Sequence, residues 1–106
     1  MFDDDLVDDL KDSYECFGFK IPDYMMGSLN RYIREGSEVG GFLTAVLEGD
    51  LFGALRKADS QNQKNLPAYA YYLYNEAPSG CYGSKAKVKA WREARAKARE
   101  KADGEN

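Results

Sequence analysis

Two short glycine-containing segments carry the residue types best suited to bind an anion. The first, Ser37–Thr44 (SEVGGFLT), places two glycines before an apolar stretch that predicts a helix. Backbone N–H groups at such a helix start lie at the positive end of the helix dipole and favour anions. Thr44 adds a hydroxyl, and two arginines lie just upstream. The candidate ligand-binding residues of this segment are Arg31, Arg34, Gly40, Gly41 and Thr44.

A second segment, Tyr74–Lys85 (YNEAPSGCYGSK), leads directly into another predicted helix start. Its glycine N–H groups and serine hydroxyls can bind phosphate oxygens, Asn75 can hydrogen-bond a base, and Tyr82 can stack on one. The candidate ligand-binding residues here are Asn75, Ser79, Gly80, Tyr82, Gly83, Ser84 and Lys85. If the two segments meet in space, within one chain or across a subunit boundary, they predict a pocket for a small anionic nucleotide.

Both segments also have a purely structural interpretation, which stays open at this point. Gly-Gly pairs are common in turns between helices, Pro78 can stop one helix, and Ser84 can cap the next. Gly49 is expected to end one helix and Asp50 to cap another. Gly53 lies inside that second helix, and helix punctuation does not explain it.

A run of tyrosines, YAYYLY, follows at residues 69–74. In a helix, this spacing divides the side chains between two faces. The residues expected to face the core are Tyr69, Leu73 and either Tyr72 or Ala70. Tyr71 and Tyr74 are then expected nearer the surface, where aromatic rings can stack on bases or contact a protein partner.

Composition argues against catalysis and against a metal site. The sequence has no histidine, which removes the commonest general base and the commonest metal ligand. It also lacks CxxC, HExxH, EF-hand and phosphate-loop patterns. Asp50, Asp59 and Glu76 have the chemistry of an acid and a base, but nothing in the sequence pairs them. Cys16 and Cys81 are expected to be free thiols. We therefore expect no enzyme, no metal and no cofactor.

Charge is distributed unevenly around a net value of −3. Residues 1–12 hold six aspartates and one lysine, whereas residues 85–101 hold eight lysines and arginines and two glutamates. The basic segment has the charge to follow a nucleic-acid backbone, and the acidic one has the charge to occupy a basic protein groove. Both also suit solvated helix faces. Nucleic-acid binding is the less favoured of these partners.

The hydrophobic pattern predicts one all-α domain over residues 1–106, a compact bundle of about five short helices with a longer basic helix at the C-terminal end. Leu6, Leu10, Tyr14 and Phe17 recur at helical spacing, which predicts an acidic amphipathic helix over residues 1–17. Residues 18–92 would form the core, and residues 93–106 a protruding or frayed basic tail. A chain of this size has a modest core, which favours a homo-oligomer.

The pattern GGFLTAVL…DL…AD…LYNEAPSGCYGS, within residues 21–91, resembles a group of small proteins encoded by tailed bacteriophages and prophages. The resemblance rests on single residues such as Tyr32, Asp50, Asn75 and Trp91, and it leaves out both charged ends. It implies a phage context rather than a mechanism. Small phage proteins outside the virion often act on the host, so the resemblance implies a host-directed binding protein.

Three functional hypotheses follow for this context. The first is a counter-defence protein that sequesters a signalling nucleotide in the glycine-rich pocket. The second is a protein inhibitor of a host defence or replication enzyme, acting through its charged ends or its tyrosine face. The third is a sequence-tolerant nucleic-acid binder. No apolar run approaches the ~18 residues of a membrane span, and the acidic start does not suit a signal peptide. We therefore expect a protein of the host bacterial cytoplasm.

Overall fold

A computed structural model describes the backbone of residues 10–104 and the side chains of residues 10–101. In chain order its elements are β1 (Glu15–Cys16), β2 (Phe19–Lys20), α2 (Asp23–Glu35), α3 (Gly41–Glu48), α4 (Leu51–Lys57), α5 (Ser60–Lys64), α6 (Leu66–Glu76), the 3-10 turn η1 (Ser79–Cys81) and α7 (Lys85–Gly104). The predicted all-α class is confirmed.

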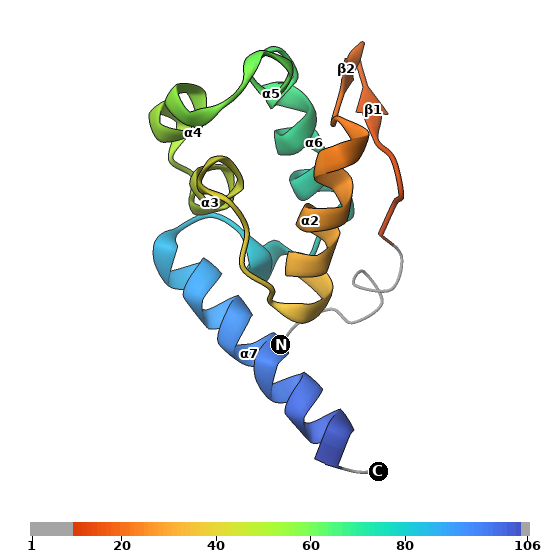
Figure 1. Ribbon diagram of the computed structural model, residues 1–106, viewed down its shortest axis with the longest axis vertical. Coiled ribbons are helices and arrows are strands. Elements are labelled where there is room, and N and C mark those ends of the chain that lie inside the picture. Colours follow the sequence, from red (N-terminus) through yellow and green to blue (C-terminus); the bar gives the residue numbers. More distant parts are fainter. Residues whose placement is uncertain (1–9, 105–106) are drawn as a thin grey trace.

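The elements form a compact body from which one helix extends (Figure 1). The hairpin β1–β2 packs on α6, α3 packs closely on α4, and α7 crosses both α2 and α3. Figure 1 shows the second half of α7 running away from the body, which explains why the longest dimension is 44 Å and the other two are 24 and 22 Å. A protruding basic helix was expected here, and its helical part continues to Gly104.

The helices begin and end at the capping residues and glycines that the sequence predicted. The Asp50 carboxylate accepts a hydrogen bond from the Gly53 N–H at 2.9 Å, and the Ser84 hydroxyl accepts one from the Lys87 N–H at 3.1 Å. Gly49 ends α3 in the left-handed conformation, with φ at 79°. A Cβ atom at Gly53 would collide with the Asp50 carboxylate, so the unexplained glycine makes room for the cap of its own helix.

The core is apolar with a small number of buried hydrogen bonds. Its buried apolar side chains come from every helix except α5, which contributes the buried Asn62, and they include Leu29, Ile33, Leu43, Leu47, Tyr69, Tyr72 and Trp91. The Trp91 indole N–H donates to the Ile33 carbonyl at 3.1 Å, which fixes α7 on α2. The Tyr32 hydroxyl donates to the Cys81 carbonyl at 2.8 Å, which fixes η1 on the same helix.

One sequence-based expectation is wrong. Residues 10–17 are not helical: Leu10 precedes an extended segment, and Phe17 and Gly18 form the turn of a two-stranded hairpin. The remaining part of that predicted helix, residues 1–9, lies outside the described residues.

Cys16 and Cys81 are free thiols, as predicted. Within residues 10–104, no helix has both the length and the apolar character needed to cross a bilayer.

Candidate functional site

The first glycine segment forms the start of α3, and the Thr44 hydroxyl hydrogen-bonds within this segment. Gly40 precedes α3 in an extended conformation, and the Thr44 Oγ1 donates to the Gly40 carbonyl at 2.9 Å. The side chain of Lys57 lies over Gly41. Arg31 is exposed on α2 and its Nη2 contacts the Ser28 hydroxyl at 3.4 Å. The hydroxyl and the arginine are thus each engaged locally.

The second segment packs against the other end of the same helix. The Gly83 N–H donates to the Leu47 carbonyl at 2.7 Å, and a Cβ atom at Gly49 would lie 3.1 Å from the Gly83 carbonyl oxygen. Because α3 has eight residues, its two ends are separated by ~12 Å along the helix axis. The two glycine segments therefore do not meet at one point in a single chain.

The candidate cations are separated as well. The Arg34 carbonyl accepts a hydrogen bond from the Arg95 Nε at 2.7 Å, so this end of α2 lies beside the middle of α7. Lys85 begins α7, ten residues or ~15 Å earlier along the helix. The structure places the candidate residues on α2, at both ends of α3 and at the start of α7, and their assembly into one pocket, within one chain or across a subunit boundary, stays a prediction.

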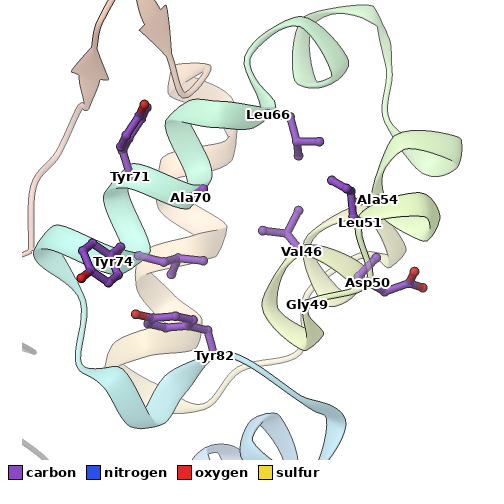
Figure 2. Close-up of a pocket in the computed structure, with 12 residues that line it drawn as sticks. Val46, Gly49, Asp50, Leu51, Ala54, Leu66, Ala70, Tyr71, Tyr74 and Tyr82 are labelled. Atoms are coloured by element: carbon purple, nitrogen blue, oxygen red, sulfur yellow. The ribbon is translucent and has the colours of Figure 1, made fainter.

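A different region has the geometry of a binding site. A cavity of about 490 Å³ opens between α6 on one side and α3 with α4 on the other. We call it the apolar groove, and it is lined by Ala45, Val46, Gly49, Asp50, Leu51, Ala54, Leu66, Ala70, Tyr71, Leu73, Tyr74 and Tyr82. In Figure 2, Val46 and Leu66 point into this space from opposite sides, whereas the Asp50 carboxylate points away from it. Its volume is typical of ligand sites.

Helix α4 borders the apolar groove and leaves its large apolar side chains exposed. It buries Gly53 and Ala54, while Leu51 is 57% exposed, Phe52 78% and Leu55 37%. A solvated surface helix normally has the opposite arrangement, with large apolar residues inside and polar ones outside. Clustered exposed apolar side chains of this kind are typical of an interaction surface.

The tyrosine run supplies the opposite wall, as its spacing predicted. Tyr69 and Tyr72 are fully buried, whereas Tyr71 is 37% exposed and Tyr74 79%. Tyr82 lies half-buried at one end of the groove, and burial raises the pKa of its hydroxyl. Among the lining residues, Asp50 is the one ionisable group that carries charge near neutral pH, and there is no lysine or arginine.

A polar cleft beside α7 is a weaker candidate. Lys85, Lys89, Arg92 and Arg99 line it together with Glu48 and Glu93, so cations outnumber carboxylates there. The Arg92 guanidinium lies 3.2 Å from the Glu38 carboxylate, and the Arg99 guanidinium lies 4.0 Å from that of Glu35. These ion pairs reduce the attraction of the cleft for an anion without removing it.

Within the described residues, no group of three potential ligands from histidine, cysteine, aspartate and glutamate is placed to hold a metal ion. Comparison with family models, with curated proteins and with solved structures gave no match. The resemblance to phage proteins therefore stays an expectation from the sequence, and function must be inferred from the site itself.

Proposed function

We propose that this protein is a protein-binding module whose apolar groove accepts one face of an amphipathic helix from a partner protein. The observation that carries the proposal is where the exposed apolar side chains lie. In the described part of the chain, the exposed large hydrophobic residues other than Tyr24 line the groove, belong to the bordering helix α4 or, for Phe17, contact the lining residue Tyr71. They are Phe17, Leu51, Phe52, Leu55, Tyr71 and Tyr74.

The extent of this surface favours a protein segment over a small molecule. A drug-sized ligand would fill the cavity but would not reach the exposed Phe52 and Leu55 of the bordering helix α4. A helical segment that enters the groove and also lies over α4 can cover them, with large side chains at positions i, i+3 or i+4 and i+7 entering the groove. Burial of the exposed aromatic rings would then supply most of the binding free energy.

The charge of the groove lining indicates which charged residues the partner helix should carry. Asp50, whose carboxylate points away at the outer edge, is the one acidic residue of the lining, and no lysine or arginine lines the groove. Tyr71, Tyr74 and Tyr82 add aromatic rings, whose faces attract lysine and arginine. The partner helix should therefore carry basic residues beside its apolar face. The same lining gives an anionic nucleotide no cation to bind, so the groove does not support that hypothesis.

The direct test is selection from a display library of amphipathic peptides of about 16 residues, long enough to form a marginal helix. The selection uses the wild-type protein, with removal of peptides that also bind an Ala70→Glu variant. Ala70 is exposed in the groove, so a glutamate there blocks the site and is well tolerated by the helix. The matched control is Ala90→Glu, on an exposed position of α7 outside the groove.

We expect enriched peptides that combine a stripe of leucine, phenylalanine or tryptophan with an excess of lysine and arginine. They should bind wild type and Ala90→Glu equally, and bind Ala70→Glu at least about tenfold more weakly, the equivalent of 1.4 kcal/mol. Equal binding to all three proteins would contradict the proposal. An acidic consensus would contradict its charge argument.

Self-association is the competing use of the same surface, and sedimentation velocity distinguishes it. A wild-type dimer that becomes a monomer on Ala70→Glu substitution would assign the groove to a second copy of this chain. A wild-type monomer leaves it available to a different protein. In the phage context implied by the sequence, that partner would be a host protein, in line with the inhibitor hypothesis.

A further inference from the structure

The hairpin tip beside the apolar groove holds an aromatic residue in an unfavourable backbone conformation. Phe17 has φ of 54° and Gly18 has φ of 82°, so both central residues of this two-residue turn lie in the left-handed region. Turns of this type strongly prefer asparagine, aspartate or glycine at their first central position. A bulky side chain there is a genuine outlier and strains the backbone.

Burial does not compensate for this strain. The Phe17 side chain is 79% exposed, the joint highest value among the large hydrophobic residues described. Among the described residues its aromatic neighbour is Tyr71, whose ring centre lies 5.3 Å away and which itself lines the apolar groove. An asparagine at this position would relieve the strain and remove an exposed apolar ring. The fold gains this one ring contact from phenylalanine, against a strained backbone and a ring left mostly in water.

The rest of the hairpin is firmly anchored, so its tip is held at a defined place. The Lys20 N–H donates to the Asn65 side-chain oxygen at 2.9 Å, and the Ile21 N–H donates to the Tyr14 carbonyl at 3.0 Å. Ile21 is fully buried. The strand pair therefore presents Phe17 at a fixed position against α6 rather than on a loose loop.

We infer that Phe17 is a contact residue for the partner helix and extends the binding surface beyond the apolar groove. This inference rests on the proposed function and assigns it a further specificity-determining residue. The partner would run along α6, with its apolar stripe in the groove and one more apolar side chain packed on the Phe17–Tyr71 pair. A strained, exposed residue beside a binding surface is the kind of position where stability is sacrificed for function.

The test measures stability and affinity on the same variants. Phe17→Asn should raise the Tm of the free protein or leave it unchanged, because asparagine suits the turn. The same variant should bind the peptide selected on wild type roughly tenfold more weakly, as expected for loss of an aromatic hot spot. Phe17→Leu, which keeps an apolar side chain on the same backbone, should lose less affinity.

The possible outcomes separate this inference from the proposed function. Loss of binding by Ala70→Glu with unchanged binding by Phe17→Asn would leave the groove in place and overturn the role of Phe17. A clear fall in the Tm of Phe17→Asn would overturn it as well, since phenylalanine would then be serving the fold. Binding unaffected by either substitution would overturn both.

Discussion

The two faces of α6 use the same residue type in opposite ways. On one face, the Tyr72 hydroxyl donates to the Asn30 side-chain oxygen at 2.7 Å, and the Tyr69 hydroxyl donates to the Asn62 side-chain oxygen at 2.5 Å. On the other, Tyr71 and Tyr74 reach solvent at the apolar groove. Tyrosines a few residues apart are thus divided between holding the fold together and forming a surface.

The buried face also shows why tyrosine rather than phenylalanine stands there. The Asn30 amide donates to the Lys11 carbonyl at 2.7 Å while its oxygen accepts from Tyr72, so one buried asparagine connects α2, α6 and the start of the described chain. Buried polar groups are tolerated only when they are paired, and no unpaired buried side-chain atom occurs in the described residues. The groove-side tyrosines carry no such structural role.

Alanine substitution of one tyrosine on each face of α6 should give the largest difference between the two faces. Tyr72→Ala should lower the free energy of unfolding by about 3–5 kcal/mol, since it removes a buried ring and leaves a cavity. Tyr74→Ala, at a position 79% exposed, should change it by no more than about 0.5 kcal/mol. Urea unfolding of the two variants measures both values, and similar losses for both would refute the division of α6 into two faces.

Removing only the hydroxyl sharpens the same comparison. Tyr72→Phe leaves the Asn30 side-chain oxygen buried without its donor, which should cost about 1–3 kcal/mol of unfolding free energy. Tyr74→Phe should have no measurable effect on stability. An unfolding free energy unchanged by Tyr72→Phe would show that the Tyr72 ring, and not its hydrogen bond, stabilises the buried face.

Alkaline pH should lower the stability of the protein because buried Tyr72 and Cys81 resist losing their protons in the folded state. Burial raises the pKa of Tyr72 to about 12 from 10.0, and burial raises the pKa of the Cys81 thiol to about 12 from 9.0. The folded protein therefore holds these protons more tightly than the unfolded chain. Their contribution to stability is complete below about pH 9 and is lost as the pH rises towards about 12.

Denaturant unfolding at a series of alkaline pH values measures this loss. For each protein, the unfolding free energy at alkaline pH is expressed relative to that protein's own value at neutral pH. The decline with rising pH should be shallower in a Tyr72→Phe, Cys81→Ala double variant than in wild type. An identical slope in wild type and double variant would exclude these two groups as its cause.

Local chemistry made part of this structure predictable. The caps at Asp50 and Ser84, the left-handed Gly49 and the assignment of Tyr71 and Tyr74 to the surface follow from rules that act within one helix turn. Each depends on spacing and on a single hydrogen bond or backbone conformation. Such features need no knowledge of what packs against them.

The hairpin was missed because two patterns competed for the same residues. Leu10, Tyr14 and Phe17 fit a helical stripe, while the turn lacks the Asn-Gly pair that usually announces a two-residue hairpin. Phe17 at positive φ breaks the local rule. Departures of this kind are expected at functional sites, which agrees with its proposed role in binding.

The candidate site was predicted only on its tyrosine side, where Tyr71, Tyr74 and Tyr82 lie, and the side formed by α3 and α4 was not. Grouping the glycine segments required them to meet, but the Gly83 N–H pairs with Leu47 at the far end of α3. The position of the second glycine segment is set by packing between residues far apart in sequence. The apolar groove depends on α4 burying Gly53 and Ala54 and exposing Leu51, an inversion that no helical periodicity in so short a segment reveals.

The smallest effect is expected for nucleotides, in a thermal-shift screen with cyclic oligonucleotides, ADP-ribose derivatives and mononucleotides. A bound ligand at ~100 times its Kd would stabilise the protein by about 2.7 kcal/mol. Because Arg31 and Lys85 lie on different elements and the groove has no cation, we expect no shift. A shift abolished by Lys85→Ala alone would assign the ligand to the polar cleft beside α7. A shift abolished by both Arg31→Ala and Lys85→Ala would place the glycine segments of two subunits in one pocket. It would also move the functional site from the tyrosine face of α6 to the ends of α3.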